Sequence, residues 1–229
     1  MLSTVLDGTT QEMRKIPNGS VDLIITSPPY NMQNSSGNKW SRLKDGYANY
    51  NDNMPHDKYV EWQRECLTEM MRLIPNAGAV FYNHKWRIQG GLLQDRQDIV
   101  SGFPVRQIII WKNSGGHNFV DNYFVPTYEV IYLIAKPKFK LIPGANGVGD
   151  VWHIIHETNS EHPCPFPVEL PRRIIESTAA KVVLDPFLGS GSTAVAAKML
   201  GRDYIGIELS QQYVAMAEER LIRTHRKPV

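Results

Sequence analysis

The segment from Lys181 to Glu208 constrains the fold more than any other part of this sequence. It reads KVVLDPFLGSGSTAVAAKMLGRDYIGIE, which is an apolar run, a glycine-rich turn, an alanine-rich stretch and a second apolar run that ends on an acid. The alanine-rich stretch suits a helix, and two strands joined by a helix lie parallel to one another. The segment therefore predicts one β-α-β unit of a parallel sheet.

The same alternation of strands and helices extends over the rest of the chain. The predicted strands are Val21–Thr26, Ala79–Asn83, Gln107–Trp111, Glu129–Ala135, Lys181–Asp185 and Tyr204–Glu208. The predicted helices are Lys58–Leu73, Glu169–Thr178, Ser192–Leu200 and Gln211–Arg223. Several strands are continuously apolar, which is typical of strands buried on both faces. We expect an α/β fold with a mostly parallel central sheet and helices on both faces.

Length and composition limit the organisation of the chain. A chain of 229 residues suits one domain, which we expect to cover residues 1–229, with a polar mobile loop at about 31–56 and an irregular insertion at about 113–160. The formal net charge is only +2, so charge neither indicates nor excludes a nucleic-acid partner. Two cysteines and no signal sequence favour a cytoplasmic protein, and no apolar run is long enough to cross a membrane.

The glycine-rich turn predicts a nucleotide or nucleoside site. Gly189 and Gly191 allow the backbone to approach a ligand closely, and a helix that begins at Ser192 directs free N–H groups toward a negatively charged group. Glu208 follows the second strand, where a carboxylate can accept hydrogen bonds from ribose hydroxyls. The turn matches neither the P-loop pattern nor the complete GxGxxG pattern.

A second motif, DLIITSPPY, ends another buried strand. Its two prolines fix the backbone and lack N–H donors, so the nearby carbonyls remain available as acceptors. A hydroxyl, a carbonyl and the flat ring of Tyr30 are therefore presented together. Such a corner suits a planar heterocycle that carries an amino group, because the acceptors bind the amino protons and the aromatic ring stacks on the base.

Together the two motifs resemble a known family. TSPPYN, HPCPFPVELPRRII, DPFLGSGST and YIGIEL are similar to segments of the S-adenosylmethionine-dependent DNA methyltransferases that modify exocyclic amino groups of cytosine (N4) or adenine (N6). The resemblance extends from about Val5 to Leu221 and is weakest between Asn113 and Ser160. Because the Ser-Pro-Pro-Tyr corner precedes the glycine turn, the order resembles the circularly permuted β group. The resemblance implies a single Rossmann-like methyltransferase domain that binds S-adenosylmethionine.

The resemblance also implies roles for individual residues. The implied catalytic residues are Ser27, Pro28, Pro29 and Tyr30. The implied cofactor-binding residues are Asp7, His162, Pro163, Asp185, Phe187, Gly189, Ser190, Gly191, Thr193 and Glu208. The implied substrate is a base flipped out of double-stranded DNA, since a base inside a duplex cannot reach such a pocket. Ser27 favours cytosine N4 over adenine N6 as the target. A homodimer and a cognate restriction endonuclease are the partners that the resemblance suggests.

Other functions fit the sequence less well. A methyltransferase that acts on RNA or on a protein amide shares the same cofactor site. A dehydrogenase that uses a nicotinamide dinucleotide accounts for the glycine turn and for Glu208, but it leaves the Ser-Pro-Pro-Tyr corner unexplained. The sequence HIIHE is not a zinc-binding HExxH motif, so we expect no metal.

Overall fold

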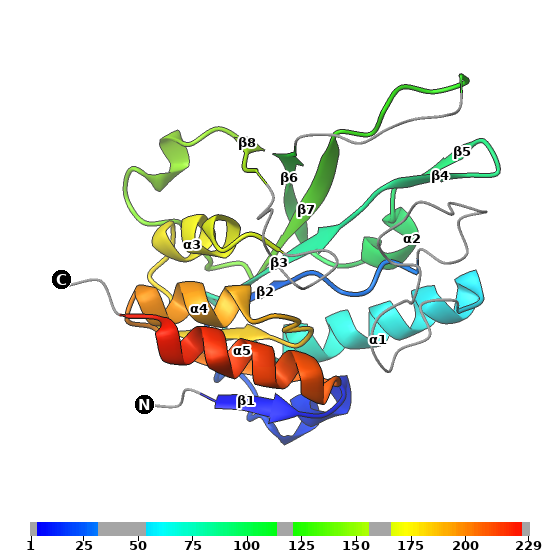
Figure 1. Cartoon of the computed structure of the whole chain (residues 1–229). Coiled ribbons are helices and arrows are strands. Elements are labelled where there is room, and N and C mark those ends of the chain that lie inside the picture. The colour runs from blue at the N-terminus through cyan, green and yellow to red at the C-terminus, as the bar shows by residue number, and fades with distance from the viewer. Residues whose placement is uncertain (1–3, 32–53, 114–120, 156–165, 226–229) are drawn as a thin grey trace.

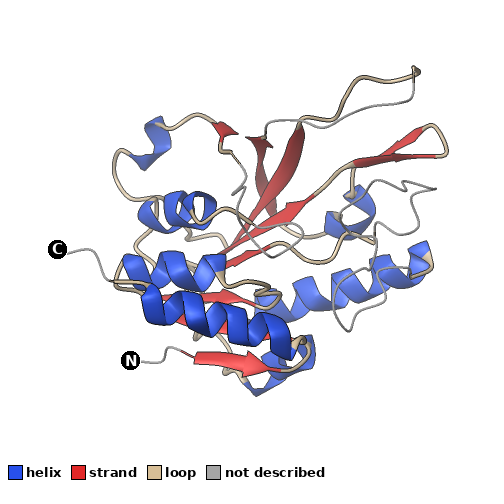
Figure 2. Cartoon of the chain, viewed as in Figure 1, coloured by secondary structure: helices blue, strands red, loops and turns tan. Residues whose placement is uncertain are grey.

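A central sheet with helices on both faces forms the core of the protein (Figures 1 and 2). The computed structural model describes residues 4–31, 54–113, 121–155 and 166–225. The strands are β1 (Thr4–Asp7), β2 (Leu23–Thr26), β3 (Ala79–His84), β4 (Arg87–Gln89), β5 (Leu92–Gln94), β6 (Val105–Lys112), β7 (Tyr128–Ala135), β8 (Val151–His153), β9 (Val182–Asp185) and β10 (Asp203–Glu208). The helices are α1 (His56–Leu73), α2 (Gln97–Val100), α3 (Glu169–Glu176), α4 (Ser192–Met199) and α5 (Gln211–Arg223), with 3-10 turns η1 (Thr10–Lys15) and η3 (Ala145–Gly147).

The order of the strands brings distant parts of the chain to one edge of the sheet. Eight strands lie in the order β1-β10-β9-β2-β3-β7-β6-β8, while β4 and β5 form a separate hairpin. Strands β1, β10, β9, β2 and β3 are parallel neighbours, and β7 runs antiparallel to both β3 and β6. The first residues of β7 therefore lie at the same edge as the last residues of β2 and β3. This confirms the predicted mostly parallel α/β fold.

Alternate residues of the strands bury the two faces of the sheet separately. In β2, Ile24 packs in a cluster with Leu67 and Met70 of α1, whereas Leu23 packs with Ile174 of α3. Helices α3 and α4 cover this second face, and α5 packs against α4 and the outer strands β1 and β10. The helices thus lie on both faces of the sheet.

The predicted elements are present, with ends shifted by at most two residues. Gln211–Arg223 is helical over the whole predicted range, and β7 begins one residue earlier than predicted. The structure also contains short elements that were not predicted, namely β1, β4, β5, β8, α2 and the two 3-10 turns. Strand β8 lies inside the segment that we expected to be irregular, where Trp152 pairs with Trp111 of β6. The helices that the structure describes include none long and apolar enough to span a membrane.

Candidate active site

The predicted site residues that the structure describes gather at the carboxyl edge of four neighbouring strands. Strand β2 leads into the Ser-Pro-Pro-Tyr corner, and β9 leads into the glycine turn beside it. Strands β10 and β1 follow in the sheet and end at Glu208 and Asp7, which are register partners. The predicted residues His162 and Pro163 lie outside the described residues. The site therefore joins two motifs that are about 160 residues apart in sequence.

The Ser-Pro-Pro-Tyr corner is held by a hydrogen bond from the buried Tyr59. Pro28 is buried, whereas Ser27 and Tyr30 are half-buried. The hydroxyl of Tyr59, on α1, donates a 2.8 Å hydrogen bond to the Pro29 carbonyl. These contacts fix the direction in which the corner leaves β2.

The residue after the corner provides a second anchor. Asn31 is buried and has a φ of +56°, a backbone conformation that asparagine tolerates better than most side chains. Its side chain amide donates to the Met54 carbonyl and accepts from the Met54 N–H, both at 2.8 Å, and the Arg87 guanidinium donates to the Asn31 carbonyl. Asn31 and Met54, the described residues that flank 32–53, are thereby hydrogen-bonded to each other.

A cluster of polar side chains that was not predicted lies directly behind the corner. The Ser27 and Tyr30 hydroxyls are 2.5 Å apart, and the Tyr30 hydroxyl donates to Glu129 Oε2 at 2.9 Å. Asn83, from β3, donates to the Tyr30 hydroxyl at 2.6 Å and to Glu129 Oε2 at 2.8 Å. Asn83 and Glu129 are both buried. We call Ser27, Tyr30, Asn83 and Glu129 the corner cluster.

His84 supports the ring of Tyr30. The centroids of the two rings are 4.8 Å apart with an interplanar angle of 31°. His84 Nε2 lies 2.7 Å from the Tyr59 hydroxyl, and Nδ1 lies 3.0 Å from the Lys85 carbonyl. Burial, together with the positive charge of Arg96, lowers the pKa of His84 well below 6.5. His84 therefore packs against the Tyr30 ring as an uncharged imidazole at neutral pH.

Asp185 organises the start of the glycine turn. Its Oδ1 accepts from the Thr26 hydroxyl at 2.8 Å and from the Phe187 N–H at 3.1 Å, and its Oδ2 accepts from the Thr193 hydroxyl at 2.7 Å. Burial raises the pKa of Asp185 to about 6, although these three hydrogen bonds favour the ionised form. One buried carboxyl thus ties together β2, the turn and α4.

The turn itself depends on its glycines. Gly191 has a φ of +87°, and a Cβ at this position would lie 2.8 Å from Cβ of Ala217 on α5. Gly189 has a φ of +52°, and its N–H donates a 2.7 Å hydrogen bond to Glu208 Oε2. Glu208 Oε1 accepts from the N–H of Ser210. Glu208, predicted to bind ribose, therefore also braces the turn.

Two further groups shape the surroundings of the turn. The half-buried ring of Phe187 contacts Trp62 of α1 edge to face, with centroids 5.7 Å apart. Arg220 of α5 donates to the Ser190 carbonyl at 2.9 Å and lies within hydrogen-bond distance of the Ser190 and Ser192 hydroxyls. The helix α4 begins at this point, so its free N–H groups face the same edge as Phe187.

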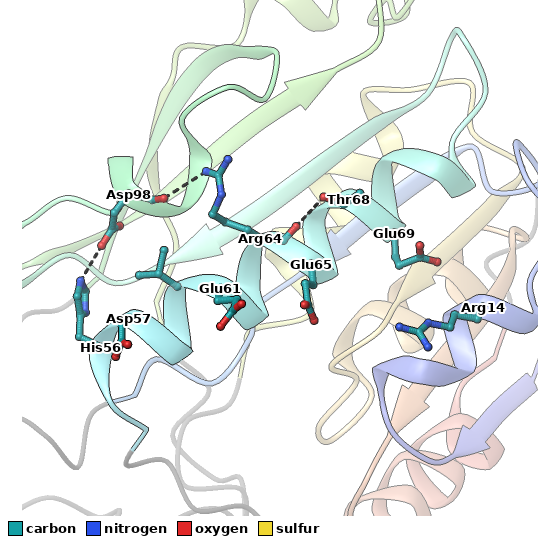
Figure 3. A pocket seen from close by; sticks show the side chains of 10 residues that line it. Arg14, His56, Asp57, Glu61, Arg64, Glu65, Thr68, Glu69 and Asp98 are labelled. Atoms are coloured by element: carbon teal, nitrogen blue, oxygen red, sulfur yellow. Dashed lines mark hydrogen bonds and ion pairs between the residues drawn. The ribbon is translucent and has the colours of Figure 1, made fainter.

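A groove lies away from these motifs, along the outer side of α1 (Figure 3). It has a volume of about 860 Å³ and includes none of the predicted site residues. Acidic side chains outnumber basic ones in its lining, which consists of Arg14, His56, Asp57, Val60, Glu61, Arg64, Glu65, Thr68, Glu69 and Asp98. The Arg64 guanidinium donates hydrogen bonds to the carbonyls of Asp98, Ile99 and Ser101. This surface therefore repels phosphate groups.

No group of three or more histidine, cysteine or acidic side chains in the described part of the chain could hold a metal ion.

The fold and the two motifs at one edge define the class of S-adenosylmethionine-dependent methyltransferases. A family model described as DNA methylase matches residues 21–219, and the chain belongs to this family. It is 31% identical to the type II methyltransferase M.HinfI of Haemophilus influenzae, over 96% of this chain and 68% of that protein. It is 28% identical to the type II methyltransferase M.BglII of Bacillus subtilis, over 96% of this chain and 69% of that protein.

Solved structures share the fold. The PvuII DNA methyltransferase, which is cytosine-N4-specific, matches with a TM-score of 0.77 and 18% identity over 96% of this chain and 86% of that one. The complex of M1.HpyAVI with S-adenosylmethionine matches with a TM-score of 0.65 and 22% identity over 96% of this chain and all of that one. A DNA adenine methyltransferase of Escherichia coli K12, YhdJ, is 25% identical over 95% of this chain and 82% of that protein.

Proposed function

We propose that this DNA methyltransferase transfers the methyl group of S-adenosylmethionine to N4 of a cytosine that has been flipped out of double-stranded DNA. Ser27 at the first position of the corner supports cytosine. Relatives named for cytosine N4 and for adenine both occur among the similar proteins, so adenine N6 is the second candidate.

The direct bond between the two motifs carries this proposal. Thr26 immediately precedes the corner, and its hydroxyl donates to Asp185, the first residue of the glycine turn. A base bound at the corner and a cofactor bound at the turn would therefore be neighbours, because this hydrogen bond joins the starts of the two motifs. Holding two reactants at a fixed separation can contribute ~7–11 kcal/mol to lowering a barrier.

The residues of the turn fit an S-adenosylmethionine molecule. Glycine at 191 lets the turn pack closely against Ala217 of α5, and the start of α4 offers N–H donors to the methionine carboxylate. Phe187 offers an apolar wall, and Glu208 accepts from the ribose hydroxyls, since a carboxylate can accept about four hydrogen bonds. We assign cofactor contacts also to Asp7, Ser190 and Thr193, and retain His162 and Pro163 as sequence-based members of the site. When bound, the cofactor supplies an electrophilic methyl group.

The corner residues activate the target nitrogen. An exocyclic amino nitrogen is a poor nucleophile, because its lone pair is delocalised into the ring. Hydrogen bonds from the amino protons to Ser27 Oγ and to the Pro28 carbonyl would draw the nitrogen toward a tetrahedral geometry and direct its lone pair at the methyl group. Tyr30 would stack on the extruded base, and the double proline keeps these three groups in fixed positions.

Charge and topology suggest how DNA approaches. The acidic groove along α1 disfavours contact with phosphates, so we propose that the duplex lies over the carboxyl edge of the sheet. We assign target recognition to the insertion at about 113–160 and a clamping role to the loop at about 31–56. We further propose a homodimer and a cognate restriction endonuclease as partners, as the resemblance of the sequence to this family suggests. We place this activity in the cytoplasm, where bacterial DNA lies.

The test is to incubate the purified protein with methyl-labelled S-adenosylmethionine and unmethylated genomic DNA, digest the DNA to nucleosides and identify the labelled one. We expect N4-methylcytosine. Label in N6-methyladenine would move the target to adenine and leave the residue roles intact. Label in RNA or in protein, but not in DNA, would reject the proposed substrate, and tighter binding of a nicotinamide dinucleotide than of S-adenosylmethionine would reject the reaction.

A further inference from the structure

The corner cluster contains a directional chain of hydrogen bonds whose last member, Glu129, neither motif includes. Glu129 is the second residue of β7 and reaches the corner only because β7 runs antiparallel to β3. Asn83 of β3 pairs with Ile131 of β7, and Glu129 lies two residues before Ile131. Glu129 is 8% exposed, and its Oε2 accepts hydrogen bonds from both Tyr30 and Asn83. A carboxylate in this position needs a chemical explanation, since buried acids are costly.

The positions of the protons in the cluster follow from counting donors. The Tyr30 hydroxyl and the Asn83 amide both donate to Glu129 Oε2, which is the acceptor in both bonds. The single proton of Tyr30 is used in this bond. The 2.5 Å contact between Ser27 and Tyr30 therefore has Ser27 as its donor.

This assignment sets the role of Ser27 toward the substrate. Its own proton points at Tyr30, and the Asn83 amide donates to Ser27 Oγ at 3.3 Å. A hydroxyl oxygen has two lone pairs, so one of them is left for Ser27 to present at the surface, where the residue is half-buried. Ser27 acts as an acceptor for an amino proton. The orientation of the Asn83 amide follows in the same way. Its nitrogen must face Glu129 Oε2, because the amide oxygen in that place would be repelled by the carboxyl oxygen.

We propose that Glu129 receives the proton that the target nitrogen loses, through Tyr30 and Ser27. This inference rests on the proposed function. As the bond between nitrogen and the methyl carbon forms, the bond between that carbon and sulfur breaks and its electron pair stays on sulfur. The nitrogen then carries one proton too many. That proton moves to Ser27 Oγ, the Ser27 proton moves to the Tyr30 oxygen, and the Tyr30 proton moves to Glu129 Oε2, so one proton is lost by nitrogen and one is gained by the carboxylate.

The distances permit such a transfer without rearrangement. The two links of the chain measure 2.5 Å and 2.9 Å between oxygen atoms, which lies within the ordinary range for O–H···O bonds. Asn83 holds the two ends of the second link together, because the same amide nitrogen lies 2.6 Å from the Tyr30 oxygen and 2.8 Å from Glu129 Oε2. Asn83 and Glu129 are thus positioning residues that act through Tyr30.

The test follows the carboxyl group itself during one turnover. Protein carrying ¹³C-labelled glutamate is mixed with S-adenosylmethionine and an unmethylated duplex that contains the target site, and infrared difference spectra are recorded alongside product formation. We expect the carbonyl stretch of a protonated carboxyl to appear with the product and to be absent in Glu129→Gln. We expect Tyr30→Phe, which keeps the ring but lacks the hydroxyl, to lose the band while slow methylation continues.

The variants separate this inference from a structural role for Glu129. Glu129→Gln should slow the single-turnover rate by ~100-fold, which is the lower end of general acid–base contributions. Its affinity for S-adenosylmethionine should stay within about twofold of wild type. Glu65→Gln, on the exposed side of α1, is the matched control and should retain the band and the rate. Product without a carboxyl band in wild type, or a band that persists in Tyr30→Phe, overturns the relay but leaves the methyltransferase function standing. Absence of DNA methylation by the wild type overturns both.

Discussion

The hydroxyl of Thr26 donates a 2.8 Å hydrogen bond to the carboxylate of Asp185, although 159 positions separate the two residues. Thr26 is the last residue of β2, and Asp185 is the last residue of β9. Because β2 and β9 are neighbouring parallel strands, the two motifs that follow them start side by side. The separation between the corner and the turn is therefore set by the sheet and by one buried side chain bond.

Replacing Thr26 by valine tests this bond. Valine has a similar shape but cannot donate, so Asp185 would lose one of its three partners. We expect the free energy of unfolding to fall by ~1–3 kcal/mol, the cost of leaving a buried acceptor unsatisfied, together with a lower methylation rate. Urea unfolding measures the first effect. Thr68→Val, at an exposed position of α1, is the control and should change stability by no more than ~0.5 kcal/mol.

Tyr30→Ala should reduce turnover and spare cofactor binding. The ring lies on the substrate side of the site, and loss of stacking on a base costs ~1–3 kcal/mol, which is about 5- to 150-fold in rate or DNA affinity. We expect the affinity for S-adenosylmethionine, measured by calorimetric titration, to remain within about threefold of wild type. A collapse of that affinity would contradict the assignment of Tyr30 to the substrate.

Gly191→Ala should destabilise the protein more than Gly201→Ala. Both glycines have positive φ, +87° and +66°, so both substitutions incur a strain of ~1–2 kcal/mol. Only at Gly191 would the new Cβ meet another atom, Cβ of Ala217 at 2.8 Å, and overpacking adds ~1–3 kcal/mol. Thermal unfolding of the two variants provides the comparison. Equal losses of stability would show that Ala217 moves aside without cost.

Asp185 should make the protein less stable as pH rises from about 4 to above 6. Burial raises its pKa from 3.8 to about 6, so the native state holds this proton where the unfolded chain has already lost it. The contribution of the group is therefore most favourable at the acidic end and is lost as pH rises through the native pKa, by ~3 kcal/mol in total at ~1.4 kcal/mol per pKa unit. Asp185→Asn removes this titration.

The measurement is the free energy of unfolding at pH 4.5 and at pH 7.5 for wild type and Asp185→Asn. Asparagine changes the hydrogen bonds to Thr26 and Thr193 at every pH, so only the difference between the two pH values is diagnostic. We expect the variant to gain relative to wild type as pH rises. Parallel curves for the two proteins would mean that Asp185 titrates normally.

Sequence patterns were sufficient for the long elements and for both motifs. Continuously apolar runs such as VVLD and VIYLIA are recognised because both faces of the sheet are buried, and the α5 range follows from its helical period. The hairpin β4–β5 was missed, since its exposed Leu92 and Leu93 do not follow the alternation of a half-buried strand. The pair Gly90–Gly91, both with positive φ, was the available signal for its turn.

Asn83 and Glu129 could not have been predicted by the same means. Each is a polar residue at one end of an apolar run, but Asn83 lies near the end of its strand and Glu129 near the beginning. They meet only if the second strand runs in the opposite direction and pairs directly with the first. Sequence periodicity carries no information on either condition, because it reports the faces of a strand and not its direction or its neighbours.

The antiparallel direction of β7 has a consequence for how the enzyme discriminates between DNA sequences. Within the segment assigned to recognition, the Asn113 N–H donates a hydrogen bond to the Thr127 carbonyl, and Glu129 follows two residues later. If a non-cognate DNA sequence displaced this part of the segment, the Glu129 carboxylate would move with it, because it lies only two residues away. We therefore expect a non-cognate DNA sequence to lower the rate of methyl transfer as well as the lifetime of the protein–DNA complex. Such a sequence can then be bound and still not be methylated.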